Sequence, residues 1–187
     1  MSEPRRGNWA RVVSGGRFYP LDPRPEEIHI GDIAHALSNV GRFGGHTIRF
    51  YSVAQHSVLV SKLLGEAGHP PDTILRGLLH DAAEAYIGDM IRPLKLSPEM
   101  DPFRAAEYHI MRCVFSRSDL VAEHDGADSL VHWADDVALA TEARDLMGGP
   151  TDWDLPYPPD PRVIHPCPPL EARHLFMAEF NMLMRLR

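Results

Sequence analysis

Cysteine is scarce in this chain of 187 residues, which contains only Cys113 and Cys167. The two lie far apart and form no C-x-x-C pair, so neither a disulfide framework nor a thiolate zinc site is expected. No run of about 18 apolar residues occurs, so no membrane-spanning helix and no membrane partner are expected. The first residues, MSEPRRGNWARVV, lack the apolar stretch of a secretory signal peptide. These absences together predict a protein of the reducing cytoplasm.

Positive charge is also in deficit, because 19 lysines and arginines face 26 aspartates and glutamates, which gives a net charge of −7. Such a chain has no general attraction for polyanions, so no nucleic acid polymer is expected as a partner. An anionic ligand would need a local cation or a metal ion to bind. Histidine, in contrast, is abundant, with 11 residues.

The alternation of strands and helices that builds a parallel sheet is missing, and the sequence predicts an all-α fold of about six main helices. A chain of this length is expected to form one domain over residues 1–187. Four segments are expected: an irregular N-terminal arm at residues 1–30, a helical core at 31–147, a proline-rich loop at 148–169 and a C-terminal helix at 170–187.

Two local patterns make specific structural predictions. Within the arm, RVVSGGRFYP predicts a small hairpin that turns at Ser14-Gly15-Gly16, because glycine supplies the positive φ of tight turns. Further on, TILRGLLHDAAEAYIGD predicts a single continuous helix that starts after Pro70-Pro71 and ends near Gly88.

The candidate chemistry centres on His80, Asp81 and Glu84, which lie in this otherwise apolar helix. In a regular helix His80 and Glu84 are four residues apart, and Asp81 and Glu84 are three apart, so all three can point to nearly one side. Buried carboxylates cost several kcal/mol unless they are paired or hold a metal. A divalent cation would satisfy the whole group.

Further ligands are expected from other helices. His56 lies within VAQHSVLV and Asp135 within HWADDVALATEARDL, both among apolar neighbours. His56 could also be a hydrogen-bonded core histidine, and Asp136 competes with Asp135 for the site. Together with His80 and Asp81, these residues form a mixed nitrogen and oxygen set that suits one divalent ion of Mn, Co, Fe, Ni, Zn or Mg. Four protein ligands would leave positions open for water and substrate.

The pattern His56 … His80-Asp81 … Asp135 resembles the H…HD…D signature of the HD-domain phosphohydrolases. The segment HDAAEAYIGDMIRPLK closely resembles the metal-site helix of the bacterial 5′-deoxynucleotidases. Arg42-Phe43 resembles the Arg-Trp pair of those enzymes, although the spacing to His56 is one residue shorter and phenylalanine replaces tryptophan. The resemblance covers roughly residues 28–147.

The resemblance implies roles for individual residues. Glu84 and Asp81 would be catalytic, with Glu84 orienting or deprotonating the attacking water. Asp135, rather than Asp136, would complete the metal ligands, and Glu142 would follow it in the family pattern. Substrate contacts are implied or suggested for five residues, namely Arg42, Phe43, Asp89, His46 and Lys95. Arg92 is an alternative to Lys95 as a cation for the phosphate.

The family therefore implies a metal-dependent hydrolase that removes the 5′-phosphate of (deoxy)nucleoside monophosphates. Two alternatives remain open: a deoxynucleoside triphosphate triphosphohydrolase on the same site, and a catalytically silent binding or sensing module. A homodimer is expected as well, with the amphipathic last helix as a candidate interface through Leu175, Phe176, Phe180, Leu183 and Leu186. The same helix could instead be a lid on the core.

Overall fold

The computed structural model describes residues 5–120, 127–149 and 152–187. The regular secondary structure of its described part is helical apart from one two-stranded sheet, which confirms the all-α prediction. Six described helices have nine or more residues. They are α1 (Ile30–Asn39), α2 (Val53–Glu66), α3 (Pro71–Leu79), α6 (Asp101–Arg117), α7 (Ala127–Leu146) and α8 (Pro169–Leu186). Shorter turns of helix are η1 (Pro25–Glu27), η2 (Arg42–Gly45), α4 (Glu84–Ile87), α5 (Arg92–Lys95) and η3 (Pro98–Met100).

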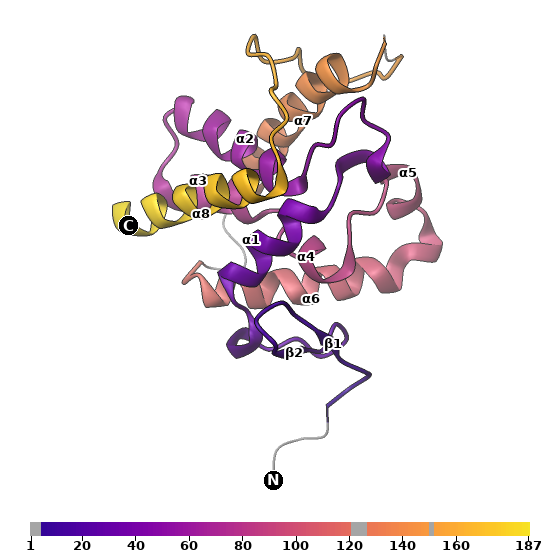
Figure 1. Ribbon diagram of the computed structural model, residues 1–187, viewed down its shortest axis with the longest axis vertical. Helices are drawn as coiled ribbons and strands as arrows, with labels where there is room; N and C mark the ends of the chain where they lie inside the picture. Colours follow the sequence, from indigo (N-terminus) through magenta and orange to yellow (C-terminus); the bar gives the residue numbers. More distant parts are fainter. Residues whose placement is uncertain (1–4, 121–126, 150–151) are drawn as a thin grey trace.

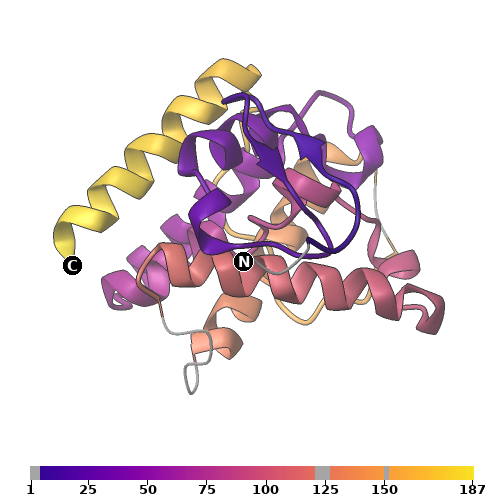
Figure 2. The ribbon, with the colours of Figure 1, turned by 90° about the horizontal axis from the view of Figure 1, so that it is seen from below.

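The N-terminal arm contains the predicted hairpin. Strands β1 (Ala10–Arg11) and β2 (Arg17–Phe18) pair antiparallel, and Gly15 in the turn has a φ of 91°. The ring of Phe18 is buried and stacks on Tyr86 of α4 at 3.8 Å between centroids. The hairpin lies at the end of the molecule opposite α7 (Figure 1). In the view of Figure 2 it lies in front of the bundle, between α6 and α8.

The prediction of one helix from Pro71 to Gly88 is wrong, because the helix is interrupted at residues 80–83. The side chain of His80 donates from Nδ1 to the carbonyl of Gly77 at 2.7 Å, and so occupies the acceptor that the next backbone N–H would use. The amides of Ala82 and Glu84 instead bind the carbonyls three residues earlier. This tightened turn carries the His80-Asp81 pair, and Gly88, with a φ of 81°, ends α4 as expected.

Helix α2 is the centre of the bundle and packs against α1, α3, α7 and α8. Its apolar residues enter both hydrophobic clusters of the core, one toward α1, α3 and α8 and the other toward α7. Helix α8 covers α1, α2 and α3 and buries Ala172, Phe176 and Leu183 there. The last helix is therefore a lid on the core, and its use as a dimer interface stays a prediction. No helix in the described ranges combines the length and apolar character needed to cross a membrane.

The close packing of α2 on α3 predicts a sharp contrast between two Gly→Ala variants. A Cβ at Gly77 would lie 2.3 Å from Cδ1 of the buried Leu64 and 3.3 Å from Val60, whereas a Cβ at Gly31 in α1 meets nothing within 4 Å. Overpacking typically costs ~1–3 kcal/mol, while alanine gains up to ~1 kcal/mol over glycine in a helix. Gly77→Ala is expected to lower the free energy of unfolding, and Gly31→Ala to raise it. Urea denaturation of both variants would measure this, and equal midpoints would contradict the packing.

Candidate metal centre

Two adjacent chain segments bring Arg42 and His56 together at the start of α2. Ser52 caps this helix, since its side chain accepts from the amide of Gln55 at 3.2 Å. The amide of Arg42 donates to the carbonyl of Tyr51 at 2.9 Å, and that of Val53 donates to Val40 at 3.0 Å. These bonds close the loop of residues 41–52 at its base. They hold Arg42 beside the first turn of α2, one turn before the fully buried His56.

Four predicted metal ligands converge at one point between α2, α7 and the His80-Asp81 turn. Nε2 of His56 lies 3.3 Å from Nε2 of His80, 3.2 Å from Oδ1 of Asp135 and 3.5 Å from Oδ2 of Asp81. Nε2 of His80 lies 3.2 Å from the same oxygen of Asp81. The ligand atoms of His56, His80 and Asp135 all lie within 4.8 Å of one another, so this group can hold a metal ion. The neighbouring Asp136 faces Arg92 instead, at 3.5 Å.

Both imidazoles are oriented by hydrogen bonds on their far nitrogens. Nδ1 of His56 lies 2.6 Å from Oε1 of the buried Glu142, and Nδ1 of His80 lies 2.7 Å from the carbonyl oxygen of Gly77. A carbonyl oxygen only accepts, so Nδ1 of His80 carries a proton, and the carboxylate of Glu142 favours the same arrangement for His56. In the neutral tautomers both Nε2 atoms then present lone pairs to each other. This is the arrangement in which histidines bind metals.

The charges around this point are strongly coupled. Burial opposes the charged imidazole of His56, as does Arg42, but the carboxylates of Glu142 and Asp135 raise the pKa of His56 to about 10. Burial likewise opposes ionisation of Asp81, yet the imidazoles of His80 and His56 hold the pKa of that carboxyl well below its usual range. His56 and His80 lower the pKa of Asp135 in the same way, against the effect of burial. The carboxylates of the cluster are therefore ionised, and their negative charge favours a cation at its centre.

Glu84 lies at the edge of the cluster and is buried with 4% of its surface exposed. Burial and the nearby carboxylates of Asp81 and Asp89 raise the pKa of Glu84 to about 10. Its Oε2 atom has no hydrogen-bond partner among the described residues. Asp89 is half-buried, and burial also raises the pKa of that carboxyl against the opposing effect of Arg42. An unpartnered, buried carboxyl close to other carboxylates is characteristic of a functional site.

Arg42 connects the cluster to the surrounding loop. One terminal nitrogen of its guanidinium donates to Oε2 of Glu142 at 3.0 Å, and the other lies 3.8 Å from Oδ2 of Asp81. Its Cζ lies 5.3 Å from the centroid of the Phe43 ring. Phe43 has a φ of 55°, a left-handed conformation that is uncommon for a non-glycine residue. The predicted pair Arg42-Phe43 is thus placed beside the cluster of candidate metal ligands.

Two other predicted substrate contacts lie further out. Nζ of Lys95 forms an ion pair with Glu107 at 2.6 Å, although its charge still acts on Glu84. His46 is an exposed residue at the end of η2, and no side-chain contact joins it to the cluster within the described residues. The structure therefore brings Arg42, Phe43 and Asp89 toward the ligands and leaves His46 at the surface.

Sequence reasoning found one feature of the site only through the resemblance and missed another. Glu142 came only from the family pattern, and its contacts with His56 and Arg42 had no separate signal in the sequence. Trp153 stacks on Phe43 with 6.0 Å between ring centroids. It lies in the proline-rich loop, far along the chain from Phe43, and no local pattern marks it as part of the site.

Comparison with known proteins gives close relatives without an assigned activity. No protein-family model matches the chain. The uncharacterized protein YfdR of Escherichia coli K12 is 36% identical over 186 residues, which cover 96% of this chain and 98% of YfdR. An uncharacterized protein of Rhodobacter capsulatus is also 36% identical, over 194 residues that cover 95% of this chain and 96% of the relative. Matches of this identity and length show that the chain belongs to the protein family that includes YfdR.

Proposed function

We propose that this protein is a metal-dependent phosphohydrolase of the HD-domain superfamily that removes the 5′-phosphate of (deoxy)nucleoside monophosphates. The observation that supports it best is the cluster of His56, His80 and Asp135 with Asp81 beside it. Two imidazole nitrogens 3.3 Å apart, both with their opposite nitrogens used as donors, are suited to bind one cation between them. We infer the reaction from the resemblance of the HD segment to the bacterial 5′-deoxynucleotidases.

The donor set fits a divalent ion. His56, His80, Asp81 and Asp135 would hold it, and their mixture of nitrogen and oxygen atoms suits Mn, Co, Fe, Ni, Zn or Mg. When bound, such an ion supplies Lewis acidity that polarises a phosphoryl oxygen and makes water more acidic. The positive charge of the ion would also offset the negative charge of the surrounding carboxylates. The Oε2 atom of Glu84, which has no hydrogen-bond partner among the described residues, is consistent with such an ion nearby.

The chain's own residues would bind and orient the reactants. The bond to Glu142 holds the guanidinium of Arg42 at the cluster. The terminal nitrogen that faces Asp81 would donate hydrogen bonds to phosphate oxygens. Glu84 would orient the attacking water and accept its proton. A nearby cation acts on this carboxyl in the opposite direction to Asp81 and Asp89, so it favours the ionised form. Asp89, at the end of the same segment, would contact the sugar.

Product analysis tests this proposal directly. The purified protein would be stripped with EDTA, reloaded with Mn²⁺ or Co²⁺, and offered matched panels of dNMP, NMP and dNTP, with products separated by ion-exchange chromatography. Nucleoside and orthophosphate from a monophosphate are the expected products. Tripolyphosphate from a dNTP would instead place the protein among triphosphohydrolases. Absence of metal-dependent turnover on every panel would favour a silent binding module.

The hydrogen bond from Glu142 to His56 predicts a graded effect on metal affinity. Glu142→Gln removes the negative charge behind the imidazole while keeping an acceptor of the same size at the 2.6 Å contact. Loss of such an outer partner typically costs about 10–100-fold in metal affinity. Isothermal titration of the stripped protein with Mn²⁺ would measure it. An unchanged dissociation constant would show that Glu142 does not support the ligand.

A further inference from the structure

The guanidinium of Arg42 has one hydrogen bond to hold it in place. One terminal nitrogen donates to Oε2 of the buried Glu142 at 3.0 Å, whereas the buried Nε has no hydrogen-bond partner among the described residues. The other terminal nitrogen lies 3.8 Å from Oδ2 of Asp81, which is beyond hydrogen-bond distance. A single hydrogen bond does not fix the orientation of the guanidinium plane, and that orientation decides whether the plane can donate to a phosphate in parallel. A second contact is therefore required to hold the plane.

The ring of Phe43 provides this contact. Cζ of Arg42 lies 5.3 Å from the ring centroid, within the range of a cation–π interaction. The backbone alone does not fix this ring, since Phe43 has a φ of 55° and Gly44 and Gly45 follow with φ values of 59° and 83°. A left-handed conformation at a non-glycine residue is costly and persists only where the surroundings hold it. The position of Phe43 thus depends on what packs against its ring.

Trp153 packs against that ring from a distant part of the chain. The two rings stack with 6.0 Å between centroids and 26° between planes. Trp153 has no hydrogen bond, ion pair or ring contact with a candidate metal ligand in the described ranges. The hollow that it borders under the proline-rich loop is lined by none of these ligands and not by Arg42. Any influence of Trp153 on the site therefore passes through Phe43.

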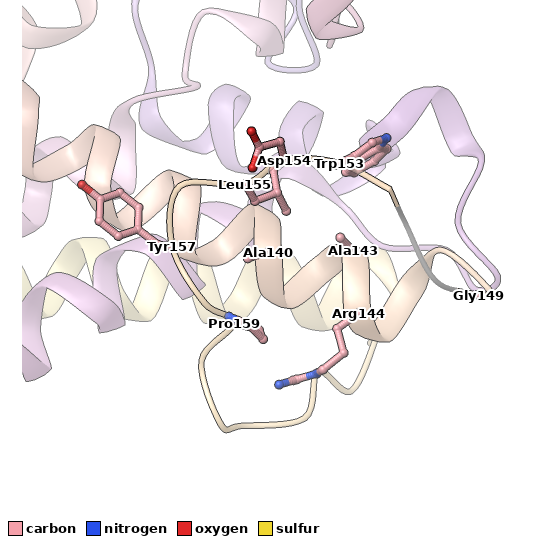
Figure 3. A pocket seen from close by; sticks show the side chains of 9 residues that line it. All are labelled: Ala140, Ala143, Arg144, Gly149, Trp153, Asp154, Leu155, Tyr157 and Pro159. Atoms are coloured by element: carbon pink, nitrogen blue, oxygen red, sulfur yellow. The ribbon is translucent and has the colours of Figure 1, made fainter.

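The loop that carries Trp153 is anchored to the bundle a few residues further on. The amide of Asp160 donates to the side chain of Thr141 in α7 at 2.9 Å. Residues 152–159 form no hydrogen bond with the other described residues, but prolines at positions 156, 158 and 159 restrict the backbone. Figure 3 shows this segment above α7, with Trp153 at one end. The stiff segment and its anchor hold Trp153 in place against Phe43.

From these contacts we infer that Trp153 is a positioning residue, which supports Phe43 and, through it, the guanidinium of Arg42. This inference rests on the proposed function, in which Arg42 binds the phosphate of the substrate. Arg42 would bind that phosphate in the ground state and in the transition state alike. Loss of its support therefore weakens substrate binding and leaves the chemical step nearly unchanged. The proline-rich loop thus contributes to the site indirectly, through an aromatic contact.

Steady-state kinetics of the Mn²⁺-loaded protein with dAMP tests this inference. Trp153→Ala is expected to raise KM about three- to tenfold, which corresponds to the loss of one aromatic pair, with kcat and the dissociation constant for Mn²⁺ nearly unchanged. Trp153→Phe keeps a stacking ring and should stay within about twofold of the original KM. Tyr157→Ala is the matched control. Tyr157 is an aromatic residue of the same segment, 40% exposed against 42% for Trp153, and its ring contacts no other ring among the described residues.

A double-mutant cycle shows whether Trp153 acts through Phe43. In a Phe43→Ala background, Trp153→Ala is expected to have no further effect on KM, because the ring that it supports is already absent. Three results would each overturn the inference while phosphohydrolysis by the original protein stands. They are an unchanged KM in Trp153→Ala, an equal rise of KM in Tyr157→Ala, and full additivity of the Phe43 and Trp153 replacements.

Isothermal titration of the Mn²⁺-loaded proteins with orthophosphate gives a readout that does not need turnover. About three- to tenfold weaker binding by Trp153→Ala, with Trp153→Phe and Tyr157→Ala close to the original protein, supports the positioning role. Equal binding by Trp153→Ala contradicts it. If the original protein does not hydrolyse dAMP, the proposed function fails. The titration alone then decides the role of Trp153, and absence of orthophosphate binding by the original protein counts against it.

Discussion

Replacement of Asp135 by alanine is expected to leave the protein with almost no bound divalent metal after reconstitution. Oδ1 of Asp135 lies 3.2 Å from Nε2 of His56 and is one of the three ligand atoms that lie within 4.8 Å of one another. Its removal leaves two imidazoles that share one remaining nearby carboxylate, Asp81. Metal content per chain would be measured by inductively coupled plasma mass spectrometry after dialysis against Mn²⁺.

The adjacent residue provides a matched control. Asp136 is also a partly exposed aspartate of α7, 21% exposed at the side chain against 35% for Asp135, but it faces Arg92. Arg92 is 66% exposed, and such surface ion pairs contribute only ~0–1 kcal/mol. Asp136→Ala is therefore expected to keep both metal and fold. Full metal content in Asp135→Ala, or equal loss in both variants, would refute the assignment of the ligands.

Glu84→Gln is expected to give the opposite combination, with metal retained and turnover lost. The glutamine keeps the size of a side chain that is only 4% exposed, so the fold should tolerate it. It removes the group proposed to take a proton from water, and general-base catalysis contributes about 10²–10⁴-fold to rate. The measurement is kcat for a deoxynucleoside monophosphate at saturating Mn²⁺, together with metal content and a urea denaturation curve.

The comparison with Asp135→Ala separates two roles for Glu84. A ligand would lose metal on replacement, and an orienting or proton-accepting residue would not. If Glu84→Gln keeps its kcat within a factor of a few while its metal content is normal, Glu84 has no part in the chemical step. The unpartnered Oε2 atom would then need another explanation.

The helical fold could be predicted from the sequence largely because its boundaries have strong local signals. Ser52, Pro70-Pro71 and Gly88 each mark a helix end through capping, a fixed φ or a positive φ. The break at residues 80–83 has no such signal. It arises because the side chain of His80 takes the carbonyl of Gly77, and a propensity pattern does not record a side chain that competes for a backbone acceptor.

The candidate site was predictable to a similar degree. His56, His80, Asp81 and Asp135 could be named because histidines and carboxylates are conspicuous within apolar helices. Asp135 could be separated from Asp136 only through the family pattern, and the structure shows the physical difference in what each faces. Trp153 could not be named at all, since its place beside Phe43 depends on how a long proline-rich loop folds back over α7. Contacts between distant irregular segments leave no periodicity in the sequence.

The position of the ligands on three separate segments has a consequence for folding itself. His56 lies on α2, His80 on the tightened turn after α3, and Asp135 on α7. These segments meet only in the assembled bundle, so an unfolded chain offers no comparable site. An ion that binds there favours the native state by mass action, by about 2.7 kcal/mol at a free concentration one hundred times its dissociation constant. The midpoint of thermal unfolding would then rise with the concentration of that ion, and the lifetime of the folded protein would depend on the supply of the ion.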